Sequence, residues 1–458
     1  MPGVPFTAKL IAARTAGALA RRAGRGGTSL PGKLLMRMDP DAIGRLASRL
    51  PEGNVVISAT NGKTTSAAMV ASVLARRGTA LVHNRAGANM AGGVASTLAA
   101  AASRDGRAQS GRLGLFEVDE FWLGSVVGQL EPKALLLGNL FRDQLDRYGE
   151  LETIAQRWEA VVADARNTAL LLNADDPLVA DLGRERDGVT YFGIDDERLS
   201  YAELQHASDS KHCRRCGAAY VYDAAYLAHL GHYHCPDCHA RRPEPTVVGR
   251  AVELHGIRSA TFTLHAGPDS VRVELPLPGL YNVYNALGAA ALCLQLGIPL
   301  VDVAAGLEAV QAAFGRAETI ALDGRQASLL LVKNPAGANE VLRTLRLEPG
   351  ELDLLGVLND RVADGRDVSW VWDADWELLR GSVRRMTCSG TRAAELALRL
   401  KYAGVEEERL RVIEDLPAAL DAAVADGSGP LYVMPTYTAL LELKTLLTER
   451  GVSREYWR

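Results

Sequence analysis

The stretch ISATNGKTTSAAMVASVLARRG, residues 57–78, contains a predicted strand, a tight turn and a helix in one continuous run. Small and β-branched residues precede the turn, and apolar residues then recur at helical spacing until Gly78 ends the helix. Backbone N–H groups in such a turn bind phosphate oxygens, a lysine adds positive charge, and a threonine hydroxyl can hold Mg²⁺. The sequence therefore predicts a phosphate-binding turn made of Thr60, Asn61, Gly62, Lys63, Thr64 and Thr65.

This turn departs from the common G-x-x-x-x-G-K-[ST] pattern, because Ile57 occupies the place of the first glycine. A bare Gly-Lys-Thr at a junction between a strand and a helix can also arise by coincidence. The chain has 51 basic residues, of which only eight are lysines, and Lys63 and Lys333 are the two lysines in glycine-containing loops. That usage favours a specific need for a compact ammonium group at these two positions.

Strand and helix patterns alternate on both sides of the turn, which predicts an α/β protein with a parallel sheet covered on both faces. A second α/β pattern follows Gly315 and predicts a separate Rossmann-like domain. We expect an N-terminal lead-in over residues 1–40, one α/β domain over 41–318 and a C-terminal α/β domain over 319–458.

Composition excludes several classes of protein. The 458 residues carry a net charge of −4, so the sequence does not predict nucleic acid as a partner. The apolar runs are too short for a transmembrane helix, and the N-terminus lacks the apolar core of a secretory signal. The sequence thus predicts a cytoplasmic protein. Its basic N-terminus is expected to form a packed or solvated helix, with contact to the inner face of an anionic membrane as the alternative.

The most specific metal signal is a pair of Cys-x₂-Cys motifs separated by 18 residues, within a module over residues 206–245. Two such motifs supply four thiolates to one tetrahedral Zn²⁺, and a closed four-cysteine site is structural. The predicted ligands are Cys213, Cys216, Cys235 and Cys238. Five histidines are alternative ligands but are expected on the surface of the module: His212, His229, His232, His234 and His239. A ribbon that reads nucleic acid is the alternative function. Cys293 and Cys388 are expected in the core.

An ordered series of motifs resembles the Mur ligase superfamily: TNGKTT, LFEVDEF, GNLFRDQLDRYGE, LLNADDP, LPGLYNVYNALGAAA and FGRAE. These ATP-dependent ligases join an amine to a carboxylate through an acyl phosphate. The resemblance implies that residues 41–318 form a Mur ligase-type ATP-binding domain, with Lys63 and Glu117 catalytic. It implies further that Glu117 holds Mg²⁺ with Thr64, and that Asn282 and Arg316 bind ATP. The alternatives are a helix N-cap for Asn282 and a surface strand end for Glu117.

The chain also departs from that family. Ala59 replaces the first glycine of the usual turn, and Gln144 replaces a histidine metal ligand. No lysine occurs between Lys133 and Lys211, where the ligases carry a carbamylated lysine. The second metal site is therefore expected to be altered. About 50 residues precede the turn, too few for the usual domain that binds a uridine-diphosphate sugar.

The inserted ribbon, the short N-terminus and the segment NDRVADGRDVSWVWDADWE, residues 359–377, together resemble the MurT family. These are the ligase-like subunits of lipid II isoglutaminyl synthase. The resemblance implies ATP-dependent amidation of a D-glutamate α-carboxyl in membrane-linked lipid II. It also implies a heterodimer with a GatD-like glutaminase, which agrees with the lack of a persuasive Cys–His glutaminase pair here. The alternatives are a free-standing ligase that adds an amino acid, and a zinc-ribbon binding protein with an inactive nucleotide fold.

Residues 360–375 form an acidic loop, and in this family an aspartate from this loop is thought to orient the glutaminase histidine. Asp367 is the first candidate, followed by Asp364 and Asp360. The alternative is that Asp364 only begins a turn and that the loop's tryptophans enter the core. The segment that starts at Lys333 is expected either to close over ATP or to form a simple junction between a strand and a helix.

Overall fold

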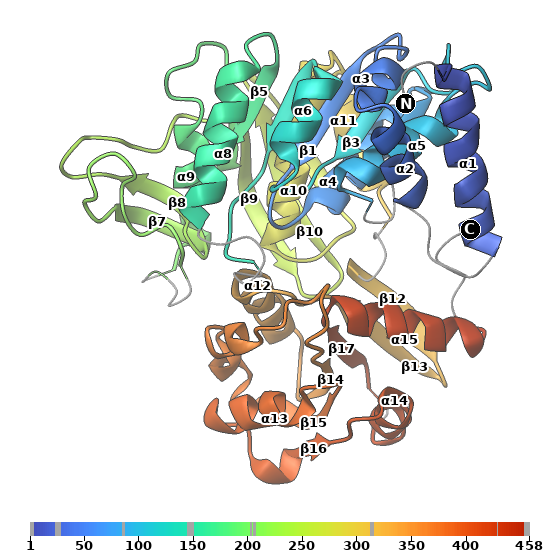
Figure 1. Cartoon of the computed structure of the whole chain (residues 1–458). Coiled ribbons are helices and arrows are strands. Elements are labelled where there is room, and N and C mark those ends of the chain that lie inside the picture. The colour runs from blue at the N-terminus through green and yellow to red at the C-terminus, as the bar shows by residue number, and fades with distance from the viewer. Residues whose placement is uncertain are drawn as a thin grey trace.

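Two α/β layers built on separate sheets make up the molecule (Figure 1). The computed structural model describes residues 4–22, 29–84, 88–143, 151–201, 204, 208–311, 316–427 and 429–452. Within these residues the larger sheet has nine strands in the order β11-β10-β9-β6-β5-β4-β1-β3-β2. Its strands are β1 (Asn54–Ser58), β2 (Leu81–His83), β3 (Leu113–Glu117), β4 (Ala134–Leu137), β5 (Ala169–Asn173), β6 (Thr190–Ile194), β9 (Val247–His255), β10 (Ser259–Ala266) and β11 (Asp269–Leu275).

In the order just given, the strands that run from β9 to β2 across the sheet are parallel, and β10 and β11 add an antiparallel edge. Among the described residues, the helices of this part are α1 (Phe6–Arg22), α2 (Leu30–Met38), α3 (Ala42–Ala47), α4 (Lys63–Arg76), α5 (Ala91–Ala101), α6 (Leu123–Leu130), α8 (Leu151–Asp164), α9 (Pro177–Asp181), α10 (Leu280–Gln295) and α11 (Leu300–Glu308), with a 3₁₀ turn η1 (Glu197–Leu199). The expected parallel sheet is thus confirmed for its central strands, while the antiparallel edge was not predicted.

Helices cover both faces of this sheet, as the continuous apolar runs require. Val55 and Ile57 of β1 lie in one core with α4, α10 and α11. Val56 lies in the other core, with α3, α5, α6 and α8, because successive side chains of a strand point to opposite faces. The turn after β1 is therefore held by packing on both sides.

The N-terminal lead-in is more ordered than its composition indicates. Leu10 and Ala13 of α1 and Leu35 of α2 are fully buried. They join the core that contains α5, which places α1 and α2 against the α/β layer (Figure 1). Of the two expectations for the N-terminus, the packed helix fits this burial.

The cysteine-rich module carries a two-stranded antiparallel hairpin, β7 (Val221–Leu227) and β8 (Leu230–His234). It projects at the side of the larger sheet near α8 and α9 (Figure 1). The inner residues Ala224, Tyr226, Leu227 and Leu230 nevertheless belong to the same core as α4 and α10. The module is therefore joined to the layer that carries the phosphate-binding turn.

The second sheet has the order β12-β13-β17-β14-β15-β16, antiparallel at β12–β13 and parallel elsewhere. Its strands are β12 (Arg316–Leu322), β13 (Arg325–Leu330), β14 (Leu352–Val357), β15 (Val383–Ser389), β16 (Leu410–Val412) and β17 (Leu431–Pro435). Its helices are α12 (Pro335–Arg346), α13 (Ala393–Tyr402), α14 (Leu416–Ala425) and α15 (Tyr437–Glu449), with 3₁₀ turns η2 (Ser369–Trp372), η3 (Trp376–Leu379) and η4 (Glu407–Arg409). This doubly wound layer confirms the Rossmann-like expectation. The proposed domain divisions at residues 40 and 318 stay predictions.

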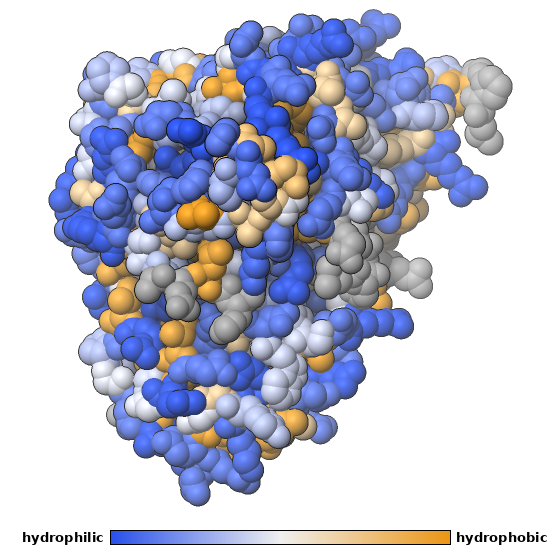
Figure 2. Space-filling model, turned by 90° about the vertical axis from the view of Figure 1, so that its left-hand side faces the viewer, coloured by the Kyte–Doolittle hydropathy of each residue, from blue (hydrophilic) through white to orange (hydrophobic). Residues whose placement is uncertain are grey.

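On the face seen in Figure 2, hydrophobic residues form small separate groups among hydrophilic ones. None of the helices in the described ranges is long and apolar enough to cross a bilayer.

Candidate active site and metal centre

The phosphate-binding turn lies between β1 and α4, as predicted. Gly62 precedes α4 with a φ of 91°, in the left-handed region that favours glycine. A Cβ atom at Gly62 would lie 1.9 Å from Oδ1 of Asn285 in α10. Both the backbone conformation and the close approach of α10 therefore require glycine at this position.

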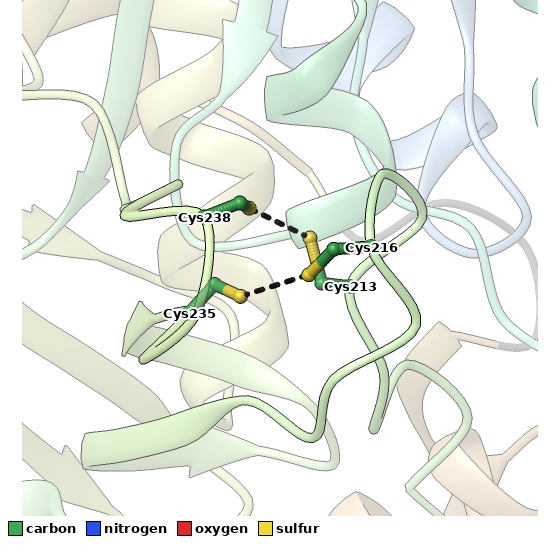
Figure 3. Close-up of side chains that lie close together, drawn as sticks. All are labelled: Cys213, Cys216, Cys235 and Cys238. Carbon is green, nitrogen blue, oxygen red and sulfur yellow. Dashed lines mark hydrogen bonds between the residues drawn. The ribbon is translucent and has the colours of Figure 1, made fainter.

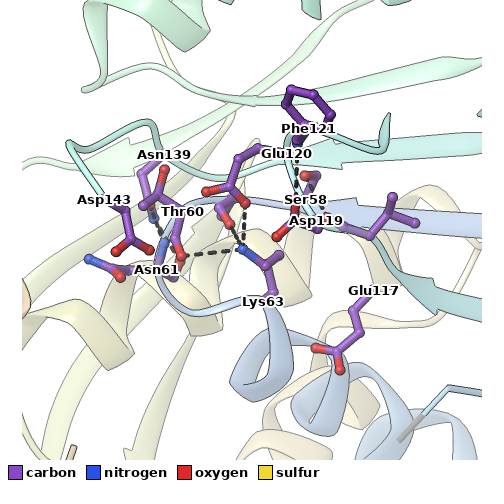
Figure 4. A network of polar contacts seen from close by, with 12 residues as sticks. Ser58, Thr60, Asn61, Lys63, Glu117, Asp119, Glu120, Phe121, Asn139 and Asp143 are labelled. Carbon is purple, nitrogen blue, oxygen red and sulfur yellow. Dashed lines mark hydrogen bonds and ion pairs between the residues drawn. The ribbon is translucent and has the colours of Figure 1, made fainter. Parts of the chain in front are cut away.

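Lys63 is buried beneath the turn rather than extended into solvent. Its Nζ lies 2.8 Å from Oε2 of Glu120 and donates to the backbone oxygens of Ala59 and Thr60 (Figure 4). Burial opposes the charge of the ammonium, but Glu120 and Asp119 outweigh it and raise the pKa of Lys63. Lys63 is thus a fixed cation whose charge is largely balanced by carboxylates in this state.

Thr64 and Glu117 lie together, as the resemblance implied. Thr64 Oγ1 donates to Glu117 Oε2 at 2.7 Å. The backbone N–H of Glu117 donates to Asn84 Oδ1 at 2.9 Å, and Asn84 Nδ2 donates back to the Glu117 carbonyl at 2.7 Å. The adjacent hydroxyl and carboxylate oxygens are the hard ligands that Mg²⁺ prefers. Glu117 is 1% exposed, so the alternative of a surface strand end is wrong.

Asn61 connects the turn to both of its neighbours. Its backbone N–H donates a hydrogen bond to Asn139 Oδ1 at 2.9 Å, and Asn139 Nδ2 donates one to the Asn61 carbonyl at 3.0 Å. Its side chain exchanges two hydrogen bonds with Asn334, of 3.2 and 3.1 Å. Asn334 belongs to the loop between β13 and α12, where its Oδ1 also caps α12. The two α/β layers therefore meet at the phosphate-binding turn.

Lys333 reaches the same place from the second layer. Its Nζ lies 2.5 Å from Asp143 Oδ2 and 3.2 Å from the Thr60 carbonyl. The segment that starts at Lys333 thus joins β13 to α12 and also contacts the phosphate-binding turn directly.

A cleft that is partly open to solvent lies beside the turn between the two layers. Asn61, Gly62 and Thr65 contribute to one wall, and Lys333 and Gly337 to another. Its apolar lining includes Phe141, Leu227, Leu230, Tyr281 and Tyr284. The cleft thus joins a polar phosphate-binding end to an apolar wall that suits a planar base.

Two residues outside the turn, Asn282 and Arg316, were predicted to bind ATP, and only Asn282 has a described side chain. Asn282 is buried in α10, and its Nδ2 donates to the Pro278 carbonyl at 2.8 Å. Asn285 is the amide that reaches the turn, and it donates to Asn282 Oδ1 at 3.1 Å. The helix begins at Leu280 with Gly279 as its N-cap, so the alternative N-cap role of Asn282 is wrong. Arg316 begins β12, and its side chain lies outside the described residues.

The four predicted cysteines converge (Figure 3). The Sγ atoms of Cys213 and Cys238 are 3.5 Å apart, those of Cys216 and Cys235 are 3.4 Å apart, and all four lie within 4.8 Å of one another. Four thiolates on one tetrahedral Zn²⁺ would be about 3.8 Å apart. Burial opposes ionisation, but backbone N–H donors from Arg215 and Cys216 lower the pKa of Cys213 to about 6. The cluster therefore fits a closed zinc site.

Burial tests the expected positions of His229 in the module and of Cys293 and Cys388 in the core. His229 is fully buried and its ring lies 5.0 Å from that of Phe141, so its expected place on the module surface is wrong. Cys293 and Cys388 are both fully buried, which confirms their place in the core. Burial raises the pKa of Cys388 to about 12, which disfavours the thiolate.

The three candidate aspartates of the acidic loop differ in their surroundings. Asp364 is buried and accepts hydrogen bonds from the backbone and hydroxyl of Thr438. Asp360 forms an ion pair of 2.7 Å with Arg392. Asp367 is exposed and accepts the Ser369 backbone N–H at 2.8 Å. Hydrogen bonds from the Ser369 side chain and backbone lower the pKa of Asp367. Of the three, Asp367 has the carboxylate best suited to meet another molecule. The loop's tryptophans expected in the core are Trp370 and Trp372, and this expectation is wrong for Trp372, which is 46% exposed.

Sequence reasoning missed several residues that shape the site. The pairing of Glu120 with Lys63 was not predicted, although two acids, Asp119 and Glu120, shortly after a buried strand are a signal. Asp175 was also missed. It is fully buried and accepts from Arg242 at 2.6 Å and from Tyr284 at 2.7 Å, which connects the cysteine-rich module to the wall of the cleft. Pairings between such distant positions leave no local pattern.

Comparison with known proteins agrees with this geometry. Residues 57–229 match the Mur ligase middle domain, and residues 331–440 match the MurT ligase C-terminal domain. Among solved structures, a pseudomurein peptide ligase type C from Methanothermus fervidus superposes with a TM-score of 0.67 at 20% identity, covering 88% of this chain and 80% of the other. MurF ligase from Thermotoga maritima gives 0.62 at 14% identity, covering 90% and 84%. The chain is therefore a ligase subunit of the Mur type, a class that uses ATP and Mg²⁺.

Two relatives define the family more narrowly. The MurT subunit of lipid II isoglutaminyl synthase (glutamine-hydrolyzing) from Streptococcus pneumoniae is 33% identical over 452 residues, which are 98% of each chain. Its counterpart from Staphylococcus aureus is 32% identical over 429 residues, which are 93% of this chain and 94% of the other. The chain belongs to the MurT family, whose members are named as subunits of a synthase.

Proposed function

We propose that this chain uses ATP to convert the α-carboxylate of the D-glutamate in lipid II into an acyl phosphate, which ammonia then attacks to give D-isoglutamine. The ammonia comes from a GatD-like glutaminase in a heterodimer. The reaction takes place in the cytoplasm, at the membrane face that presents the lipid-linked substrate. Membership of the MurT family supports the substrate and the reaction class.

The observation that carries the proposal is the pairing of Thr64 with Glu117 next to the turn that holds Lys63. Thr64 Oγ1 and Glu117 Oε2 would hold Mg²⁺, which when bound offsets negative charge on the phosphates. The backbone N–H groups at the start of α4 bind phosphate oxygens, and Lys63 adds a positive charge from below the turn. Together these groups stabilise the charge that develops during phosphoryl transfer.

The chemistry explains why phosphate is needed. Direct attack by ammonia on a carboxylate does not give an amide, because an oxide ion would have to leave. After one carboxylate oxygen bonds to the γ-phosphorus and ADP leaves, ammonia attacks the carbonyl carbon and phosphate departs with that oxygen. The attacking nitrogen loses a proton, and an amide remains. Lys63 and the turn act in the first of these steps, the transfer of the phosphoryl group.

A separate source of ammonia is consistent with the thiols of this chain. Cys293 and Cys388 are fully buried, and the other four cysteines form the cluster, so none of the six is arranged as an accessible glutaminase nucleophile. We assign Asp367 to the interface with the glutaminase, where its carboxylate would orient the partner's catalytic histidine. We assign Cys213, Cys216, Cys235 and Cys238 to a structural Zn²⁺.

The decisive experiment follows an oxygen atom. The chain, purified together with its glutaminase, is given ATP, glutamine and lipid II labelled with ¹⁸O in the D-glutamate α-carboxylate. We expect one ¹⁸O atom in each released phosphate and an amide in the product, both read by mass spectrometry. Unlabelled phosphate would refute the acyl phosphate.

Two controls separate the alternatives. Lys63→Ala should abolish phosphate release, while Lys401→Gln, in an exposed pair with Glu407, should leave it unchanged. Equal turnover with a free amino acid in place of ammonia would favour a ligase that adds amino acids. Persistent absence of ATP turnover would favour an inactive nucleotide fold.

A further inference from the structure

Two lysines approach the phosphate-binding turn, one from each α/β layer. Lys63 starts α4 in the first layer, and Lys333 lies in the loop between β13 and α12 in the second. Lys333 Nζ contacts Asp143 Oδ2 at 2.5 Å and the Thr60 carbonyl at 3.2 Å. The second layer therefore brings a positive charge to the backbone of the turn itself.

Asp143 is the carboxylate that receives this charge. Its side chain is 7% exposed, and it follows β4 on the chain. Burial and the nearby Glu120 raise the pKa of Asp143, and Lys333 opposes that effect. In Figure 4, Asp143 and Glu117 lie on opposite sides of Lys63. The site thus has one carboxylate beside Thr64 and another, on the far side of the turn, beside Lys333.

The sequence next to Asp143 lacks the ligands that Mur ligases use for a second divalent cation. In Mur ligases a histidine and a carbamylated lysine complete that second site. Here Gln144 replaces the histidine, and the chain has no lysine between Lys133 and Lys211. Asp143 already accepts an ammonium group, and a divalent cation on the same carboxylate would be repelled by it.

We propose that the ammonium group of Lys333 replaces the second divalent cation, so that phosphoryl transfer here uses a single Mg²⁺, at Thr64 and Glu117. An ammonium group has three N–H donors. Asp143 and Thr60 account for two of them among the described residues, which leaves one for a phosphoryl oxygen. This inference rests on the proposed function, because it gives Lys333 a role in that reaction.

The ammonium group of Lys333 lies against the turn only when the two layers are in contact. Lys333 is adjacent to Asn334, whose amide exchanges two hydrogen bonds with Asn61 of the turn. When the second layer is seated in this way, the ammonium lies against the turn. A metal ion held only by the first layer would not have that dependence.

The test counts metal ions on the full wild-type chain. Mn²⁺ replaces Mg²⁺, a non-hydrolysable ATP analogue is present at saturation, and bound Mn²⁺ is measured by electron paramagnetic resonance. We expect one Mn²⁺ for each bound nucleotide. Two Mn²⁺ ions with nucleotide bound would overturn the inference alone, whereas failure to bind nucleotide would overturn the proposed function as well.

Variants test the charge directly. Lys333→Gln should lower kcat at saturating ATP by about 100-fold, because it removes a charged donor to the transferring group. Lys333→Arg should restore part of this loss, and Lys401→Gln should have no effect. Unchanged kcat in Lys333→Gln would overturn the inference. The metal count on wild-type protein decides the matter even if the variant does not fold.

Discussion

The side chains of Asn61 and Asn334 exchange two hydrogen bonds, of 3.2 and 3.1 Å, across the junction of the two α/β layers. The two residues are 273 positions apart in sequence. Asn61 lies in the phosphate-binding turn, and Asn334 caps the first helix of the second layer. The N-cap residue of α12 is thereby connected to a residue of the phosphate-binding turn.

Asn334→Ala should weaken both functions of this side chain. Loss of the cap on α12 should lower the free energy of unfolding by about 1 kcal/mol, and loss of the pair with Asn61 should raise the KM for ATP. Asn334→Asp is the matched control, because its carboxylate keeps the cap and loses only the donor to Asn61. Urea denaturation and steady-state kinetics measure the two effects. Equal stability of both variants and the wild type would contradict the capping role.

Gly62→Ala should abolish nucleotide binding. The new Cβ would lie 1.9 Å from Asn285 Oδ1, and the positive φ of 91° is unfavourable for alanine. Gly78→Ala provides the control, since Gly78 has a φ of 70° with nothing within 4 Å of its Cβ position. That control should cost only about 1 kcal/mol of stability and leave binding intact. Calorimetric titration with an ATP analogue distinguishes the two, and normal affinity in Gly62→Ala would refute the close approach.

Cys213→Ser should lower the zinc content and the thermal stability of the chain without directly removing a catalytic group. Structural zinc sites contribute folding energy, because the ligands are assembled only in the folded state. Cys293→Ser is the comparison, since that thiol is buried in α10 away from the cluster and should leave zinc content unchanged. Elemental analysis of the purified proteins gives the answer. Wild-type zinc content in Cys213→Ser would refute the ligand assignment.

Asp367→Asn should spare amidation driven by free ammonia and weaken amidation driven by glutamine by about 10-fold or more. The reason is that Asp367 is proposed to act on the glutaminase rather than on the ligase reaction. Asp360→Asn, which breaks an ion pair with Arg392, tests whether any charge lost from this loop has the same effect. Parallel assays with ammonium chloride and with glutamine make the comparison. Loss of both activities in Asp367→Asn would place the residue in the ligase centre instead.

Glu340 should make stability depend on pH in the acid range. Burial raises the pKa of this carboxyl above its usual 4.5, and the pair with Arg343 at 2.8 Å opposes only part of that effect. The folded state therefore holds the proton more tightly than the unfolded state, so the contribution of Glu340 to stability falls as pH rises through and above 4.5. Glu340→Gln cannot ionise, and its stability relative to the wild type should rise over the same interval. Urea denaturation at several pH values measures this.

The control for Glu340 is Glu395→Gln, which breaks an exposed pair with Arg392 at the same i,i+3 spacing. Exposed pairs contribute about 0.5 kcal/mol or less, so this variant should differ little from the wild type at any of these pH values. A stability difference for Glu340→Gln that is constant with pH would argue against the raised pKa.

The sequence by itself determined most of the elements and which cysteines converge. The phosphate-binding turn, the pairing of Thr64 with Glu117, the four converging cysteines and the two α/β layers were all predicted, because each is encoded by local spacing or by an ordered set of motifs. Even the burial of Cys293 and Cys388 follows from the apolar pattern around them.

Only the tertiary structure decided which distant side chains meet. It paired Lys63 with Glu120, Lys333 with Asp143 and Asn61 with Asn334, and it buried His229 against Phe141. It also placed Asn285, rather than Asn282, against the turn. Hydrogen bonds and ion pairs act over a few ångströms in space, whatever the separation along the chain, so a pattern of neighbouring residues cannot specify them.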